Sequence, residues 1–378
     1  MHAEVTVRPV RSSSDLRQFI ALPYRLYRDD PLWAAPLRRD VQTLLSPRKN
    51  PFFEHAEVQT FLAEREGRVV GRIAAIANRL HNEFHGDRVG FFGFFETELD
   101  QEIADALLDA AGSWLRDRGF DTMRGPASFS TNDECGVLVN GFDTPPVLMM
   151  PHNPRQYPEL LESAGFTKAK DLLVYQGGSM ETVIPTPERL TRGVELIRKR
   201  MGLTLRTLRL KEFSREVERI KEMYNRSWER NWGFIPLTDH EIDHLAAQFK
   251  PVVVPELAPF LEKDGQPIGF ALALPDLNVA FRRNRQGWFL PGVVRLLFDL
   301  KTRRINRMRI LLLGVLPEYR GKGLDALLYH WLWETGNRLG IHWAEAGWIL
   351  EDNAAMNAGL LKIGFTVYKT YRLYDRSL

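Results

Sequence analysis

The stretch Gly314-Val315-Leu316-Pro317-Glu318-Tyr319-Arg320-Gly321-Lys322-Gly323-Leu324-Asp325 decides how this chain of 378 residues is interpreted. It follows the apolar run 309–315, which predicts a strand, and precedes residues 324–335, whose apolar positions recur at helical spacing. Glycines there let backbone N–H groups approach a ligand closely. A helix N-terminus favours anions, and Arg320 and Lys322 add positive charge. The pattern indicates a phosphate-binding loop, although a glycine pair alone is also compatible with a plain helix start.

The same residues resemble the Arg/Gln-x-x-Gly-x-Gly/Ala motif of the GCN5-related N-acetyltransferase (GNAT) superfamily. Arg320 and Gly323 match its first two key positions, whereas Asp325 replaces the usual Gly or Ala and places a negative charge near the expected pyrophosphate. The resemblance implies acyl-CoA as co-substrate and no metal. It also implies an oxyanion-binding N–H near Val315. The implied CoA-binding residues are Val315, Arg320, Gly321, Lys322, Gly323, Leu324, Asp325 and Asn353.

A second motif supports this resemblance. Glu351-Asp352-Asn353, followed by the run from Leu360 to Gly364-Phe365, is similar to the next GNAT motif, in which an Asn near Asn353 contacts the cofactor arm. Many members carry a Tyr at the position of Leu360 and use it as general acid for the leaving thiolate. In this chain the acid is therefore either absent or supplied from elsewhere.

The two halves of the chain share one order of expected elements: strand, helices, hairpin, strand, helix, strand, short helix, Gly-Phe and strand. This order predicts an α/β (α+β) fold of two tandem GNAT-like domains, each with a mixed central sheet flanked by helices. The expected boundaries are 1–178 for the first domain, 179–202 for a linker and helix, and 203–378 for the catalytic domain. The first half has Glu98-Leu99-Asp100-Gln101 where the glycine loop would lie, so we expect that half not to bind CoA.

Finer similarity is carried by Asn225–Trp228, by Asn231–Phe234, by Trp348–Asn353 and by Thr131–Glu134 with Gly136. These segments resemble the branch of the superfamily that includes bacterial ceramide synthases. The resemblance implies an N-acyltransferase that moves an acyl group from acyl-CoA to a primary amine, with a long-chain acyl group and a sphingoid-type lipid amine as one form. An acetyl-CoA-dependent enzyme for a small amine or peptide, and a non-catalytic CoA-binding protein, remain the alternatives.

An attacking amine must be neutral, so the reaction needs a proton acceptor. Our candidates are Glu345 on the expected strand 343–350 and Glu351 and Asp352 at its end. The alternative interpretation of Glu345 is an exposed strand residue, and that of the other two is loop solvation or helix capping.

The resemblance to the GNAT superfamily also implies an acceptor pocket at a group of aromatic residues, with Trp228, Trp232 and Phe234 at its border. Core packing is the alternative interpretation for Trp228 and its neighbour Tyr224, whereas Gly233 opens a loop at Trp232 and Phe234.

Residues 276–308 form an insert between strands that usually have a short connection. Its segment 281–304 combines aromatic, apolar and basic residues with a single acid, Asp299, as helices in a membrane interface do. A helical insert packed on its own domain with a solvated basic rim is the alternative, and RNA binding is a third.

Composition limits the remaining classes. The chain has 44% apolar and 26% charged residues, and its net charge of +3 is no signature of nucleic-acid binding. One cysteine, Cys135, excludes an intramolecular disulfide and suits a reducing compartment. No apolar run reaches the length of a membrane span. We expect a cytoplasmic protein acting on a small-molecule or lipid amine, with the inner face of the membrane as an open alternative. The sequence does not indicate an oligomeric state.

Overall fold

The computed structural model describes residues 4–229 and 231–378 and divides the chain into two compact units. Unit 1 comprises residues 1–172, 278–296 and 369–378, and unit 2 comprises 173–277 and 297–368. The units therefore do not follow chain order. The last ten residues close unit 1, and the first part of the insert belongs to unit 1 although its flanking strands belong to unit 2.

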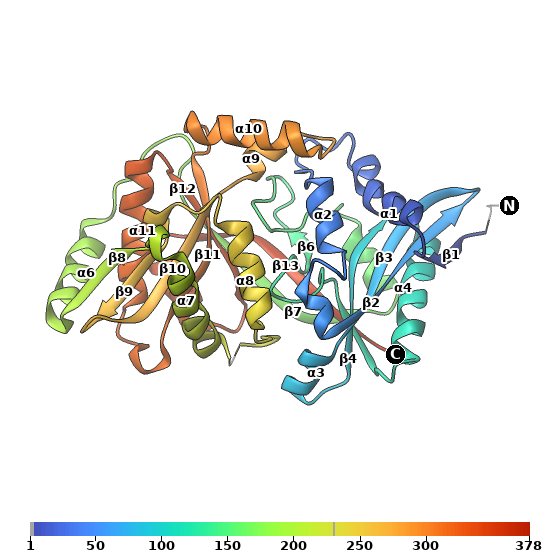
Figure 1. Cartoon of the computed structure of the whole chain (residues 1–378), viewed down its shortest axis with the longest axis horizontal. Helices are drawn as coiled ribbons and strands as arrows, with labels where there is room; N and C mark the ends of the chain where they lie inside the picture. The colour runs from blue at the N-terminus through green and yellow to red at the C-terminus, as the bar shows by residue number, and fades with distance from the viewer. Residues whose placement is uncertain (1–3, 230) are drawn as a thin grey trace. The chain divides into compact units, whose positions relative to one another are not determined.

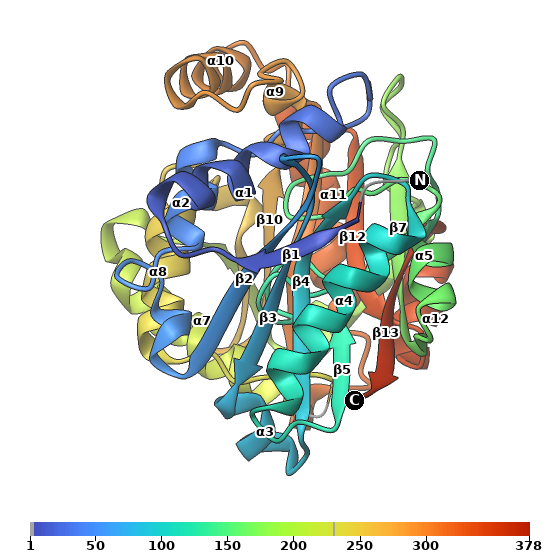
Figure 2. The same cartoon turned by 90° about the vertical axis from the view of Figure 1, so that its right-hand side faces the viewer.

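Unit 1 is built on a mixed sheet in the order β1-β2-β3-β4-β5-β13 (Figure 1). The ladders joining β1, β2, β3 and β4 are antiparallel, β4 and β5 are parallel, and β13 is antiparallel to β5. Figure 2 shows α4 lying across one face of this sheet. The elements are β1 (Thr6–Pro9), α1 (Ser13–Leu26), α2 (Arg38–Leu44), η1 (Pro51–Glu54), β2 (Ala56–Arg65), β3 (Arg68–Asn78), α3 (Arg79–His85), β4 (Val89–Thr97), α4 (Gln101–Arg116), β5 (Thr122–Gly125), β6 (Val137–Asn140), α5 (Tyr157–Ser163), the first part of β7 (Thr167–Gly178), α9 (Asn278–Phe281), the first part of α10 (Phe289–Lys301) and most of β13 (Thr366–Ser377).

Unit 2 has a sheet of the same kind in the order β8-β9-β10-β11-β12-β7. The ladders from β8 to β11 are antiparallel, and β11 and β12 are parallel. The elements are the end of β7, α6 (Glu188–Met201), β8 (Leu203–Thr207), η2 (Leu210–Glu212), α7 (Phe213–Trp228), α8 (Asp239–Phe249), η3 (Pro255–Leu257), β9 (Pro259–Lys263), β10 (Gln266–Pro275), the end of α10, β11 (Arg307–Val315), η4 (Pro317–Tyr319), α11 (Asp325–Leu339), β12 (Trp343–Leu350), α12 (Ala354–Lys362) and the start of β13.

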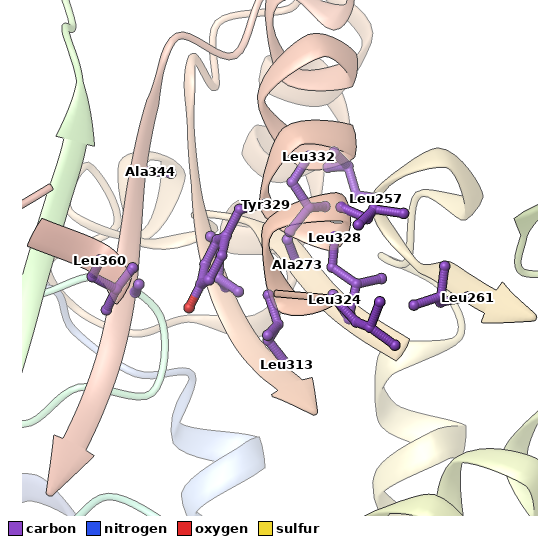
Figure 3. Close-up of a cluster of buried hydrophobic side chains, with 14 of the residues drawn as sticks. Leu257, Leu261, Ala273, Leu313, Leu324, Leu328, Tyr329, Leu332, Ala344 and Leu360 are labelled. Atoms are coloured by element: carbon purple, nitrogen blue, oxygen red, sulfur yellow. The ribbon is translucent and has the colours of Figure 1, made fainter. Parts of the chain in front are cut away.

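The core of unit 2 fixes the orientation of α11. Leu324, Leu328 and Leu332 recur at helical spacing and are almost fully buried (Figure 3). They pack with β-strand residues that alternate along the sheet, among them Leu313 and Ala344. Burial of each large apolar side chain contributes roughly 1.5–3 kcal/mol. This packing fixes α11 on the sheet, with the loop 316–324 between the end of β11 and the start of the helix.

The expected fold class is confirmed, and two helices begin with caps formed by residues close together in sequence. Ser12 and Asp15 form the reciprocal capping box that starts α1, with N···O distances of 3.1 and 3.0 Å. Thr238 and Glu241 do the same for α8. Residues 28–55, between α1 and β2, contain the short helices α2 and η1. The expected order has one strand between the long helix and the short helix of the first half, whereas the structure has two strands of four residues each there, β5 and β6.

Candidate active site

The glycine loop lies between β11 and α11, as its sequence predicts. Gly321 and Gly323 have φ angles of +72° and +70°, which residues with a Cβ rarely adopt. No heavy atom lies within 4 Å of a Cβ added at Gly321, so the loop is open there. Leu324 is the N-cap of α11 and gives no side-chain hydrogen bond to the helix. Unpaired N–H groups at this helix start therefore remain for an anion.

A gap opens between β11 and β12 on the way to this loop. Their parallel ladder runs from Arg307 opposite Trp343 to Ile310 opposite Ala346, and both strands then continue, to Val315 and Leu350. The cause is a β-bulge in β11. Ile310 faces Ala273 of β10 and Leu312 faces Leu272, so Leu311 is an extra residue. A bulge bends a strand away from its neighbour and often stands beside active sites.

The two basic residues of the loop contact backbone carbonyl groups. The guanidinium of Arg320 donates to the carbonyl oxygens of Ser227 and of Val315, the latter at 3.3 Å. Lys322 donates from Nζ to the carbonyl of Glu318 at 3.1 Å and lies beside the Tyr319 ring. Arg320 therefore braces the loop against α7 and β11, and both residues bring positive charge to its mouth.

Asp325 begins α11 and faces α12. Its Oδ2 lies 3.5 Å from the Cβ position of Gly359, so a larger residue at 359 would contact the carboxylate. An acid in the first turn stabilises a helix through the macrodipole. Asp325 thus stabilises α11 and at the same time adds negative charge beside the open N–H groups.

The end of β12 carries the predicted residues Glu351, Asp352 and Asn353. Glu351 and Asp352 are exposed in the turn after Leu350. Asn353 caps α12, accepting from the Met356 N–H at 3.3 Å. Asn357, which the sequence did not single out, donates to the carbonyls of Leu350 and Glu351 at 3.1 and 3.2 Å. This amide holds α12 against the end of the gap.

Leu360 of α12 is fully buried. Two tyrosine hydroxyls from other elements contact side chains of this helix. Tyr175 of β7 donates to Oδ1 of Asn357 at 3.0 Å, and Tyr329 of α11 lies 3.2 Å from the sulfur of Met356. Figure 3 shows Tyr329 and Leu360. Burial is the main cause that raises the pKa of both tyrosines. Both hydroxyls therefore hold their protons at neutral pH, as a general acid must. No local sequence motif marks them, because they reach α12 from other elements.

Glu345 lies at the inner end of the gap and is fully buried, so its interpretation as an exposed strand residue is wrong. The hydroxyl of Tyr368 donates to its Oε2, and the Arg309 guanidinium lies 3.8 Å from Oε1. Arg309 also donates to the carbonyl of Gly347, the first residue of β12 beyond the ladder, with its Nη2 at 3.0 Å. The alternation that places Met308 and Ile310 in the core directs Arg309 and Glu345 to the opposite face of the sheet.

Trp228 lies on the face of the unit 2 sheet that carries Arg309 and Glu345, together with aromatic neighbours. Trp228 packs flat on Gly314 of β11, where a Cβ would lie 2.5 Å from its ring, and it stacks on Tyr224 at 5.0 Å. Phe234 is buried and lies 5.8 Å from Tyr224, whereas Trp232 is half-buried. Phe234 is thus part of the packing rather than a loop edge. Trp228 is the predicted aromatic residue that directly covers a strand of the gap.

A basic segment at the end of α6, which was not among the predicted site residues, lies near the loop. Ile197 of α6 is 3.4 Å from the Cβ position of Gly323, and Arg198, Lys199 and Arg200 follow it in exposed positions. Their signal was three consecutive basic residues at the end of a helix. They add positive charge at the side of the loop where α6 ends.

Comparison with known proteins gives the family. The chain is 38% identical to the bacterial ceramide synthase of Caulobacter vibrioides, over all of this chain and 98% of that protein. It is also 36% identical to protein YghO of Escherichia coli K12, over 98% of this chain and 95% of that protein. No family model matches the sequence.

A solved tandem GNAT protein from the clavulanic acid biosynthesis pathway shares the fold at 14% identity. Its TM-score is 0.58, and the match covers 99% of this chain and 98% of that one. A GCN5-related N-acetyltransferase from Sphaerobacter thermophilus has a TM-score of 0.53 at 14% identity, with 99% and 95% covered. The chain belongs to the tandem GNAT acyltransferases.

In this tandem GNAT acyltransferase, unit 1 has a bulged strand, β4, that corresponds to β11 of unit 2. It has no gap beside that strand like the one between β11 and β12. Phe94 has a φ of +52° at the bulge of β4, the counterpart of Leu311. Ala127 then fills the space beside β4: its N–H donates to the carbonyl of Phe92 at 2.8 Å, and a Cβ on Gly93 would lie 2.0 Å from its oxygen.

The N-terminus of α4, which corresponds to that of α11 in unit 2, is occupied by a side chain of the protein itself. Asp100 caps α4, accepting from the Glu102 N–H at 2.9 Å, and pairs with Arg65 at 2.7 Å. A carboxylate of the chain itself thus stands where an external anion would bind. This arrangement supports the expectation that unit 1 binds no CoA.

Within the described residues, no helix is long and apolar enough to cross a membrane, and no group of three or more His, Cys, Asp or Glu side chains is placed to hold a metal ion.

Proposed function

We propose that this tandem GNAT acyltransferase moves an acyl group from acyl-CoA to a primary amine in unit 2. The gap between β11 and β12, which ends at the open glycine loop, carries this proposal. The loop and the uncapped N-terminus of α11 suit the pyrophosphate, with Gly321, Lys322, Gly323 and Leu324 nearest to it. From Ile310 to Val315 the gap extends for five residues, about 16 Å of strand, which is comparable to an extended pantetheine arm.

The peptide groups that border the gap suit the amides of that arm. Beyond Ile310 and Ala346 the two strands no longer pair with each other, so their peptide groups need other partners. Arg309 and Arg320 donate to the carbonyls of Gly347 and Val315, and the ligand would serve other peptide groups along the gap. The arm has two amide groups of its own. Val315 would lie at the phosphate end of the arm and the bulge at Leu311 near its thioester end, so in this proposal the oxyanion-binding N–H expected near Val315 comes instead from the strand near the bulge.

The chemistry needs one proton acceptor and one donor. The amine nitrogen attacks the thioester carbonyl carbon, the new C–N bond forms, the C–S bond breaks, and CoA leaves as a thiolate that takes up a proton. Glu345 lies at the thioester end of the gap and is hydrogen-bonded to Tyr368, which suits a group that accepts the amine proton. Glu351 and Asp352 follow the other end of β12, which favours Glu345 over them.

The acceptor is a lipid-like amine in this proposal. The support is the relative that is called bacterial ceramide synthase, which is similar over the whole chain. A long-chain acyl donor and a sphingoid-type base follow from that name. The half-buried face of Trp228 over Gly314 offers apolar surface for a chain beside β11.

Release of CoA thiol measures the reaction directly. We expect purified protein to release CoA from palmitoyl-CoA when a long-chain amino alcohol is present, and to form the amide as seen by mass spectrometry. Faster CoA release from acetyl-CoA with small amines would contradict the lipid substrate and indicate a small-molecule acceptor. Binding of acyl-CoA without release, with every amine tested, would leave a non-catalytic CoA-binding protein and contradict the proposal.

A further inference from the structure

The outer face of α10 is apolar and exposed. Among the described residues, fifteen large hydrophobic side chains are exposed, and six of them fall within the eleven residues from Trp288 to Phe298. Leu290, Val294 and Leu297 are 70%, 60% and 61% exposed and follow helical spacing. The opposite face of the helix carries Leu296 and Asp299, which are buried. The helix thus holds its apolar stripe toward solvent, the reverse of what folding alone favours.

Basic side chains flank this stripe. The segment 281–304 has seven basic residues and one acid, and that acid, Asp299, is fully buried. Lys301, Arg303 and Arg304 follow the stripe in exposed positions, and the Arg304 guanidinium lies 4.8 Å from the Phe298 ring. At the start of the helix, Arg39 of α2 lies 4.6 Å from the Phe289 ring.

The segment before α10 is anchored within unit 1. The backbone N–H of Arg38 donates to the carbonyl of Gly287 at 2.9 Å, and Arg285 donates to the carbonyls of Arg28 and Asp30, both at 2.7 Å. A Cβ at Gly292 would lie 2.6 Å from a methyl carbon of Leu37. The first part of the insert therefore packs within unit 1. These contacts hold the inner face of the helix in place, so the outward direction of the stripe is built into the fold.

We propose that α10 docks the protein onto an anionic phospholipid bilayer, with Leu290, Val294, Leu297 and Phe298 in the apolar boundary and the flanking basic residues at the lipid phosphates. A helix of this kind lies in the plane of the interface and does not span it. Anionic lipids attract clustered Lys and Arg. Arginines beside exposed rings match this environment, since the ring enters the apolar layer while the guanidinium stays at the headgroups.

A second copy of the chain is a poorer occupant. The thirteen residues of α10 make a strip of about 20 Å by 10 Å, or roughly 200 Å², which is well below the roughly 800 Å² per partner of a stable interface. A bilayer covers the stripe and offers the opposite charge.

Docking is independent of the proposed reaction and is tested on the full chain with vesicles. We expect the wild-type chain to co-sediment with phosphatidylcholine–phosphatidylglycerol vesicles, less so with phosphatidylcholine alone, and less so in 0.5 M salt, where charges about 3–5 Å apart or more are screened. The double substitution Leu290→Glu with Leu297→Glu should lower vesicle binding at least tenfold. Leu99→Glu with Leu210→Glu is the matched control, since both residues are exposed and lie outside α10, and its binding should equal that of the wild type.

Two readouts keep docking separate from catalysis and folding. Circular dichroism and the melting temperature of the Leu290/Leu297 variant should match those of the wild type, because the changed side chains face solvent. CoA release with a water-soluble short-chain amine, measured without vesicles, reports the reaction alone. Deletion of 281–304 is a less suitable test, because it removes the anchoring contacts of Arg285 in unit 1.

Several results would overturn the proposal. These are a wild-type chain that does not bind the anionic vesicles, a Leu290/Leu297 variant that binds them as the wild type does, and a control variant that loses binding equally. A variant that changes only from dimer to monomer would assign the stripe to self-association. Binding of RNA through this segment in place of vesicles would also contradict it.

Discussion

The hydroxyl of Tyr368 donates a hydrogen bond to the buried carboxylate of Glu345, at the place where β12 leaves its ladder with β11. The two residues are distant in sequence and meet because the start of β13 belongs to unit 2. Arg309 lies 3.8 Å from the same carboxylate and holds the carbonyl of Gly347. A buried acid with a hydroxyl partner and a cation therefore stands at the inner end of the gap.

Replacement of Glu345 by Gln should lower kcat about 10²–10⁴-fold, because it removes the proposed proton acceptor while keeping the side-chain size. Tyr368→Phe should give a smaller loss, because the carboxylate remains in place but loses one hydrogen bond. Glu351→Gln is the matched control at the exposed end of β12. If the Glu345 variant keeps wild-type turnover and the Glu351 variant loses most of it, the proton acceptor is Glu351 and not Glu345.

Alanine at Gly321 should weaken acyl-CoA binding at least tenfold, because a Cβ disfavours the φ of +72° that presents the loop N–H groups. Gly265→Ala is the control, since it has a φ of +75° in the turn between β9 and β10 and equally open surroundings. Both variants should lose about 1–2 kcal/mol of stability from backbone strain. Isothermal titration with CoA separates them, and equal affinity for CoA in the two variants would exclude the loop as the binding site.

Substitution of Asp325 by Asn should lower the KM for acyl-CoA roughly two- to fivefold at low salt, because it removes a negative charge next to the open helix start. The same change should cost about 0.3–1 kcal/mol of stability, since the acid favours the positive end of the helix dipole. Asp239→Asn, in the first turn of α8, should show a comparable effect on stability with an unchanged KM. A raised KM in the Asp325 variant would mean that the carboxylate helps to hold the ligand.

Unit 1 should become less stable as pH rises from about 5 to 8. Burial raises the pKa of Glu96 to about 7, although the nearby Arg72 guanidinium and hydrogen bonds from Tyr27 and Tyr157 lower it. In the unfolded chain the group titrates near 4.5, so the folded state binds more protons between pH 4.5 and 7. Its stabilising contribution is present below pH 4.5 and is lost as pH rises through 7.

The substitution Glu96→Gln isolates this effect. The free energy of unfolding of the wild type, minus that of the variant, should fall by about 3 kcal/mol between pH 5 and pH 8, as measured by urea denaturation. Glu159→Gln, at an exposed position of α5, should give no such pH-dependent difference. A difference that rises with pH would mean that Glu96 is stabilised as the carboxylate.

The sequence by itself determined the loop, the tandem order of elements and the family. Gly321, Gly323 and the apolar stripe of α11 are local signals, because backbone conformation and helical spacing depend on residues that are close along the chain. The same holds for the caps at Ser12 and Thr238. It also determined that the first half lacks glycines before α4.

Only the tertiary structure decided which acid lies at the gap between β11 and β12, and which faces of the sheets and of α10 are covered. Glu345 looked like one of three equivalent candidates, and its burial depends on the bulge at Leu311, on Arg309 and on Tyr368 from a distant strand. Likewise, no short sequence motif predicts that Ala127 fills the space beside β4, because Ala127 comes from a segment more than thirty residues later in the chain. The outward direction of the α10 stripe depends on anchoring to residues more than two hundred positions earlier, such as Arg28 and Arg38. Long-range packing sets these features, and sequence periodicity records only the short-range part of it.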